Sequence, residues 1–103
     1  MSLRERLEAA LAAGQDTALL RFTLGDLLVR EGEPDAGCAH LRRAVELDPD
    51  YSAAWKLLGR TQLKAGDDAA ARETLSRGLD VARRRGDRQA EREMQVFLKR
   101  LER

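Results

Sequence analysis

Trp55-Lys-Leu-Leu-Gly59 is the stretch of sequence on which the fold depends, and Gly66 and Leu75 follow it at intervals of seven and nine residues. Trp55, Leu58 and Gly59 share one face of a helix, because residues three and four apart are neighbours on a helix surface. Gly66 can adopt the left-handed backbone conformation with which helices commonly end. A second helix, which carries Leu75 on its apolar face, then completes a predicted helix-turn-helix unit.

The same spacing recurs 34 residues earlier in the chain. A fixed period between 20 and 50 residues indicates stacked repeats, each of which buries its apolar face against its neighbours. The aligned pairs are Leu24-Gly25 with Leu58-Gly59, Gly32 with Gly66, Ala36 with Ala70, Leu41 with Leu75 and Arg43 with Arg77, and further back Leu7 aligns with Leu41 and Ala10 with Ala44.

Six helices and no strand are predicted from apolar spacing and from helix start and stop signals. Side chains that can accept from free backbone N–H groups mark the starts, and glycine or a residue before proline marks the ends. The expected caps are Ser2 with Glu5, Asp16 or Thr17, Asp50 or Ser52, Asp67, and Asp87. The third helix begins at Pro34, and the expected stops are Gly14, Gly32, Asp48-Pro49, Gly66 and Gly86.

These residues resemble the tetratricopeptide repeat (TPR) family, whose repeat reads W-x-x-L-G-x-x-Y, then A-x-x-x-F and P, at a period of about 34 residues. The matching residues are Leu24, Gly25, Gly32, Leu41, Ala44 and Pro49 in the first repeat, and Trp55, Leu58, Gly59, Gly66, Ala71 and Leu75 in the second. The departures are Arg21 for Trp, Leu28 and Gln62 for Tyr, and Arg83 for the second Pro, which predicts a longer fifth helix.

The resemblance implies an all-α fold, a right-handed α-α superhelix (a TPR-like solenoid) of about six antiparallel helices. The whole chain, 1–103, is expected to form one domain: an N-terminal half repeat at 3–14, repeats at 18–51 and 52–85, and a C-terminal capping helix at 87–102. Gly25 and Gly59 would let the two helices of each repeat approach closely. The alternative is chance agreement within a helical bundle rich in Ala, Leu and Arg.

The composition argues against nucleic-acid and membrane partners. The net charge is +1, so no global field attracts polyanions. The run Arg83-Arg84-Arg85 is the one local bias; it is either a contact for nucleic acid or a solvated helix end. No apolar run approaches the roughly 20 residues of a membrane span. The single cysteine, Cys38, excludes an intrachain disulfide, and with no signal-peptide pattern at the start a cytoplasmic location is expected.

Catalysis has little support in the sequence. Cys38 and His40 are two residues apart, so on a helix they point to different faces and cannot form a nucleophile pair. No zinc-ligand spacing, phosphate-binding loop or serine-hydrolase motif occurs. No enzyme activity, metal or cofactor is therefore expected.

Binding is the function that the resemblance implies, because in this family the first helix of each repeat lines a concave groove. The positions one step around from the core stripe would line it. They are Phe22, Asp26, Val29, Arg30, Lys56, Arg60, Leu63 and Lys64, with Leu19 and Ala53 beside them. One side of this groove is apolar and the other basic, which suits an unidentified protein or peptide that carries acidic and apolar residues.

The predicted function is that of a non-enzymatic protein–protein interaction module, an adaptor or assembly factor, as a monomer or a weak homodimer. Two alternatives stand beside it: a structural module that forms homodimers through its end helices without a separate ligand, and an enzyme or nucleic-acid-binding protein. Within the groove, Asp26 could instead pair with Lys56 or Arg60, which would leave the basic residues as a solvated face.

Overall fold

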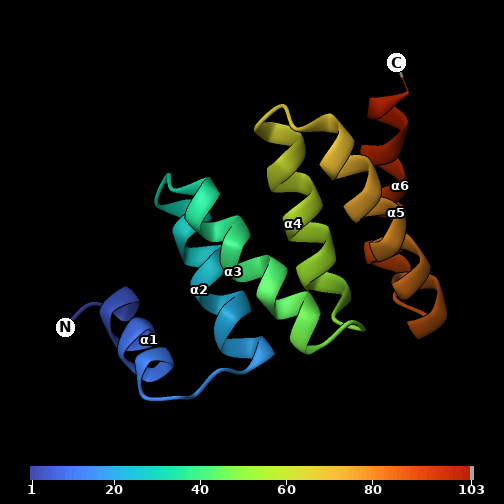
Figure 1. The fold of residues 1–103 in the computed structure, drawn as a ribbon. Coiled ribbons are helices and arrows are strands. Elements are labelled where there is room, and N and C mark those ends of the chain that lie inside the picture. Colours follow the sequence, from blue (N-terminus) through green and yellow to red (C-terminus); the bar gives the residue numbers. More distant parts are fainter. Residues whose placement is uncertain (103) are drawn as a thin grey trace. The chain divides into compact units, whose positions relative to one another are not determined.

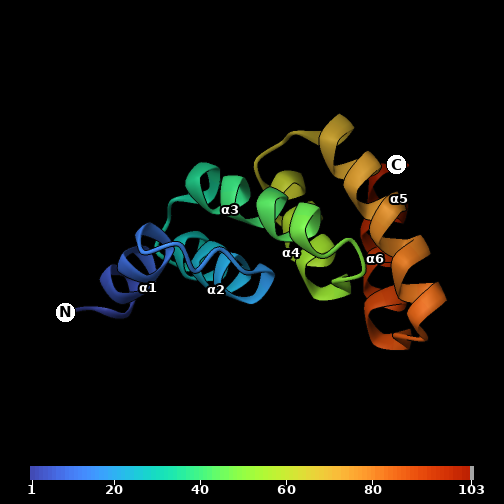
Figure 2. The same ribbon diagram turned by 60° about the horizontal axis from the view of Figure 1, so that its bottom comes forward.

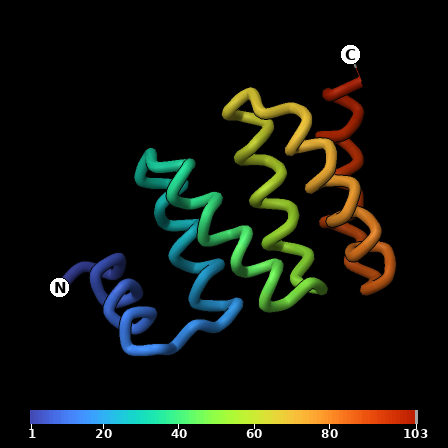
Figure 3. The backbone as a smooth tube through the Cα atoms, viewed as in Figure 1, coloured from blue at the N-terminus to red at the C-terminus, as the bar shows by residue number. Residues whose placement is uncertain are grey.

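The computed structural model describes residues 1–102, which form six α-helices and no strand, as predicted (Figure 1). The helices are α1 (Leu3–Ala12), α2 (Ala18–Arg30), α3 (Pro34–Leu47), α4 (Ser52–Lys64), α5 (Asp68–Arg85) and α6 (Arg88–Leu101). The backbone groups into two compact units: Met1–Asp48, which holds α1 to α3, and a second unit that begins at Pro49 and holds α4 to α6. Helices α2 and α3 form one antiparallel hairpin, and α4 and α5 form another (Figure 3).

Most helix ends follow the predicted signals. Ser2 and Glu5 form a capping box at α1, and the Thr17 hydroxyl accepts from the Leu20 N–H at 3.1 Å at the start of α2. Asp67 and Asp87 cap α5 and α6 through their carboxylates. Because these caps bind backbone two or three residues away, they depend on local sequence alone.

The predicted cap of α4 is wrong. Tyr51 occupies the N-cap position and makes no side-chain cap bond. The Ser52 hydroxyl instead donates to Asp87 Oδ2 at 2.7 Å, and Asp50 pairs with Arg84. Both candidate caps are therefore used by partners about 34 residues away along the chain.

In the first unit, the close approach of α2 and α3 depends on two glycines. A Cβ added at Gly37 would lie 2.9 Å from the Gly25 carbonyl oxygen and 2.7 Å from Val29 Cγ2. Leu24 and Leu41 are fully buried beside this contact. Helix α1 packs against α2 but buries none of its own residues, so the α2–α3 hairpin carries the core of this unit.

In the second unit, α6 packs mainly against α5 and also against α4 (Figure 2). The buried cluster of this unit comprises Ala71, Leu75, Ala82, Ala90 and Met94, and Leu63, Phe97, Leu98 and Leu101 pack against it. Helix α5 has 18 residues against 14 in α3, as expected where arginine replaces the proline.

Two glycines set the helix spacing of the second unit. At Gly59 a Cβ would lie 2.5 Å from Leu75 Cδ2, and at Gly78 it would lie 2.7 Å from both Trp55 Cβ and Met94 Sδ. Trp55 is buried, and its indole N–H donates to the Pro49 carbonyl at 2.8 Å. The opening stretch of the sequence is therefore a packing motif, and any ligand must meet other positions.

Candidate protein-binding surfaces

The predicted binding positions on α4 divide into two kinds. Lys56 is half-buried, and its ammonium lies 2.8 Å from Glu93 Oε2 of α6. Leu63 is half-buried and packs against the core cluster. Arg60 and Lys64 are exposed. Lys56 and Leu63 therefore join α4 to the rest of the unit, while Arg60 and Lys64 present charge to solvent.

Helix α6, which was expected only to cap the repeats, adds further residues to this surface. Glu93, Phe97 and Arg100 recur at intervals of four and three, which places them on one stripe. The Glu93–Lys56 ion pair shows that this stripe faces α4, and the Arg100 guanidinium lies 5.5 Å from the centre of the Phe97 ring. We call these residues together the α4–α6 surface: Lys56, Arg60, Leu63, Lys64, Glu93, Phe97 and Arg100.

The charge of the α4–α6 surface is strongly positive. Glu93 is its one carboxylate, against four cationic side chains. The hydrogen bond from Lys56 is the main cause that holds the pKa of Glu93 below its ordinary value, and the charges of Lys56 and Arg60 act in the same direction. Glu93 therefore stays ionised at neutral pH, and a net positive charge remains along the surface.

In the first unit, the predicted stripe on α2 carries Phe22, Asp26, Val29 and Arg30. Asp26 pairs with Arg30 at 3.0 Å, one turn along the same helix. Phe22 and Val29 are half-buried, and Arg30 is exposed. The sequence left open a pair between Asp26 and Lys56. In the structure, Asp26 binds Arg30 and Lys56 binds Glu93, each within its own unit.

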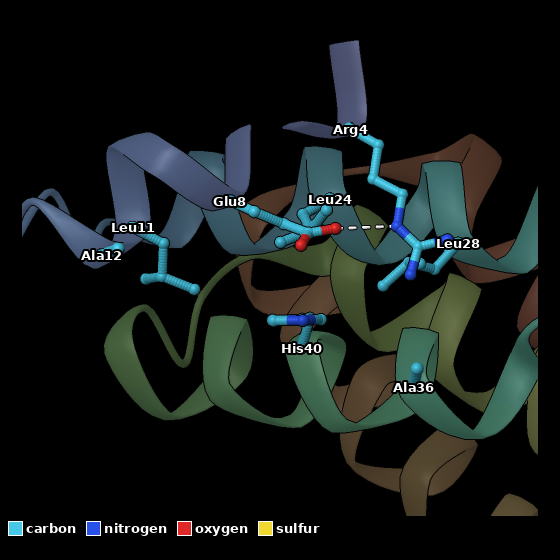
Figure 4. A pocket seen from close by; sticks show the side chains of 8 residues that line it. All are labelled: Arg4, Glu8, Leu11, Ala12, Leu24, Leu28, Ala36 and His40. Carbon is cyan, nitrogen blue, oxygen red and sulfur yellow. Dashed lines mark hydrogen bonds and ion pairs between the residues drawn. The ribbon is translucent and has the colours of Figure 1, made fainter. Parts of the chain in front are cut away.

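A hollow of about 370 Å³ lies between α1 and the α2–α3 hairpin (Figure 4). Its walls are mostly apolar, and Glu8 of α1 and His40 of α3 face one another across it. The residues that line it are Arg4, Glu8, Leu11, Ala12, Leu24, Leu28, Ala36 and His40. Arg4 pairs with Glu8, Glu31 and Glu33, and so ties α1 to the turn between α2 and α3.

Arg21, at the position of the family's tryptophan, is the centre of a polar network. Its guanidinium binds Asp16 at 2.7 and 3.1 Å and contacts His40 Nδ1 at 3.0 Å. Burial is the main cause that lowers the pKa of His40, and the charge of Arg21 adds to it. His40 is therefore neutral at pH 7 and accepts from Arg21, while Cys38 is buried. The two side chains belong to different environments, as their spacing predicted.

Two structural features are absent from residues 1–102. No helix in this part of the chain has both the length and the apolar character needed to cross a membrane. No group of three or more His, Cys, Asp or Glu side chains lies together there in a way that could hold a metal ion.

Comparison with known proteins agrees with the fold and with the residue pattern. The family model of the tetratricopeptide repeat matches residues 28–91. The TPR repeat-containing protein PA0015 of Pseudomonas aeruginosa is 52% identical over 99 residues, which are 96% of this chain and 94% of that protein.

Solved structures give the same result. The solution structure of protein BPP2914 from Bordetella parapertussis is 50% identical and has a TM-score of 0.82, over 98% of this chain and 88% of that one. The crystal structure of a tetratricopeptide repeat domain protein from Salinibacter ruber is 25% identical, with a TM-score of 0.76 over 82% of this chain and 94% of that one. The chain belongs to the tetratricopeptide repeat family and has its all-α helical-repeat fold.

Proposed function

We propose that this protein is a non-enzymatic adaptor or assembly factor that binds a segment of a partner protein on its α4–α6 surface. The tetratricopeptide fold is in general a protein–protein interaction module, which supports this class of function. The observation that carries the proposal is the excess of positive charge beside half-buried apolar side chains. Arg60 and Lys64 are exposed, and Leu63 and Phe97 lie half-buried beside them.

The chemistry of this surface defines its ligand. Carboxylates of an extended or helical segment would meet Arg60 and Lys64, and apolar side chains would pack on Leu63 and Phe97. Exposed charges of this kind contribute mainly to the rate of association and to the choice of partner. We extend the same proposal to the α2 stripe, where Phe22 and Val29 offer apolar area and Arg30 is an exposed cation next to Asp26.

Charge reversal at Arg60 and Lys64 tests the proposal. These two residues are better targets than Lys56, because glutamate at 56 would face Glu93 and destabilise the packing of α6. We expect Arg60→Glu with Lys64→Glu to reduce capture of the partner from the source cell by about tenfold or more, since two attractive contacts become repulsive. Capture is measured by affinity chromatography with quantitative mass spectrometry.

The matched control is Arg6→Glu with Arg42→Glu, which changes the net charge equally at exposed positions of the first unit. It is expected to capture the partner as the unchanged protein does. In urea denaturation, the free energy of unfolding of both variants should lie within about 0.5 kcal/mol of that of the unchanged protein, because surface substitutions rarely cost more. Equal capture by both double variants would exclude the α4–α6 surface as the binding site.

A homodimer without a separate ligand is the second candidate, and the exposed apolar residues of the first unit favour it. Leu3 is 55% exposed and Leu19 is 66% exposed. Exposed apolar side chains of this size suit a contact with a second copy of the chain. Sedimentation equilibrium over a concentration series separates the candidates, because a strict monomer removes this one.

A further inference from the structure

A second basic feature lies at the turn between α5 and α6, where a surface depression of about 520 Å³ opens. It is lined by Arg83, Gly86, Arg88, Glu91 and Arg92. We call it the arginine pocket. Three guanidinium groups and one carboxylate therefore gather in one concave part of the surface.

Among residues 1–102, the charges of the arginine pocket are not balanced. Arg83 Nε lies 3.2 Å from Glu91 Oε2, which uses the one carboxylate of the pocket. Arg88 and Arg92 have no side-chain hydrogen bond or ion pair with any of residues 1–102. They stand four residues apart on α6, where like charges repel. An anion that binds both would remove this repulsion.

The backbone leaves this depression open. Gly86 ends α5 with φ of 72°, in the left-handed region, and a Cβ at that residue would meet nothing within 4 Å. At the start of α6, Asp87 already accepts from the Ala90 N–H at 3.1 Å, so its carboxylate occupies the N-cap position. The cationic groups that the pocket offers to a ligand are therefore its arginine side chains.

We propose that the arginine pocket binds an acidic segment of a partner protein, with one carboxylate at Arg88 and a second at Arg92. The planar guanidinium group offers paired N–H donors that match a carboxylate. Glu91 lies in the same depression and disfavours one compact anion of high charge, whereas carboxylates on separate residues can each meet one arginine.

The arginine pocket is separate from Arg60 and Lys64, the exposed cations of the α4–α6 surface. Arg60 and Lys64 lie near the C-terminal end of α4, and the pocket follows the C-terminal end of α5. Because α4 and α5 are antiparallel, these features lie at opposite ends of the second unit (Figure 3). Either site can therefore fail an experiment without the other.

An NMR titration of the whole chain with N-acetylated hexaglutamate tests this proposal. At low salt we expect the amide chemical shifts of Gly86, Arg88 and Arg92 to change as peptide is added and to reach a plateau. Arg88→Glu with Arg92→Glu should raise the dissociation constant obtained from these shifts by about tenfold or more, because both contacts become repulsive. The control variant Arg6→Glu with Arg42→Glu should bind within about twofold of the unchanged protein, and circular dichroism confirms that each variant is folded.

The variant Arg60→Glu with Lys64→Glu should keep the shifts at Gly86, Arg88 and Arg92, whatever it does to partner capture. Shifts confined to the α4–α6 surface would overturn the proposal, as would equal affinity after reversal of Arg88 and Arg92. Inorganic phosphate at the same concentration should leave these amides nearly unmoved. Equal shifts with phosphate would mean a general anion site and would also overturn it.

Discussion

Replacing Trp55 with alanine is expected to lower the free energy of unfolding by about 3–5 kcal/mol, the usual cost of removing a buried aromatic side chain. Trp55 is 9% exposed, and its Cβ is among the atoms nearest to Gly78. Its N–H donates to the Pro49 carbonyl, and the Arg77 guanidinium lies 5.6 Å from the centre of its ring. Urea denaturation followed by circular dichroism at the helix band measures the loss.

Two milder variants divide this loss into its causes. Trp55→Phe keeps most of the buried ring and removes the hydrogen bond, so we expect a loss of about 1–2 kcal/mol. Arg77→Ala removes the contact of the exposed guanidinium with the ring and should cost less than about 1 kcal/mol. If Trp55→Ala cost no more than Arg77→Ala, the indole would not be the packing centre of the second unit.

Replacing Leu75 with alanine is expected to cost about 2–5 kcal/mol, because Leu75 is fully buried and its removal leaves a cavity. Gly59→Ala should also destabilise, since its Cβ would lie 2.5 Å from Leu75 Cδ2. Overpacking costs about 1–3 kcal/mol, and the higher helix propensity of alanine offsets about 1 kcal/mol of it. The double variant should lose less than the sum, because the new methyl group enters the space that Leu75 leaves. We expect a coupling of about 0.5–3 kcal/mol in a double-mutant cycle.

The matched control pairs Leu75→Ala with Gly25→Ala. The contact of Gly25 is with Leu41 in the other unit, where a Cβ would lie 2.8 Å from Leu41 Cγ. These two losses should add within about 0.3–0.5 kcal/mol, as for independent sites. Simple additivity of Gly59→Ala and Leu75→Ala would contradict the helix packing described for the second unit.

The positions at which helices approach closely could be predicted, because the glycines that allow it recur with the repeat period. Gly25 and Gly59 stand where a side chain would collide with Leu41 and Leu75, and they therefore allow the close approach of helices that the resemblance implied. The caps Thr17, Asp67 and Asp87 were predictable from local sequence, because a cap binds the next turn of its own helix.

Contacts between residues far apart in the chain could not be predicted in the same way. Tyr51 is the N-cap of α4, and the two expected caps bind distant side chains instead, Asp50 to Arg84 and Ser52 to Asp87. The contact of Arg21 with His40 of α3 forms where the family pattern expects tryptophan. Each of these depends on the geometry between helices, which a periodic pattern does not specify.

The candidate site could be predicted only in part, because some of its contacts also join different helices. Helical spacing placed Lys56, Arg60, Leu63 and Lys64 on one stripe of α4. The sequence did not show that Lys56 would be held by Glu93 or that Leu63 would pack against the core. It also gave α6 only the role of a cap, although the spacing of Glu93, Phe97 and Arg100 could have indicated a second stripe.

Site-specific photo-cross-linking is the most direct test of whether a partner protein binds the α4–α6 surface. A photoreactive benzoylphenylalanine replaces Val96, which is 49% exposed on α6 between Glu93 and Arg100, so no basic residue is lost. The control position is Ser76, exposed on α5. On irradiation in the source cell we expect a cross-link to a different protein from position 96 that is much stronger than from 76 and that is lost on reversal of Arg60 and Lys64. Equal cross-linking from both positions, or cross-links from position 96 only to a second copy of the chain, would contradict the proposed function.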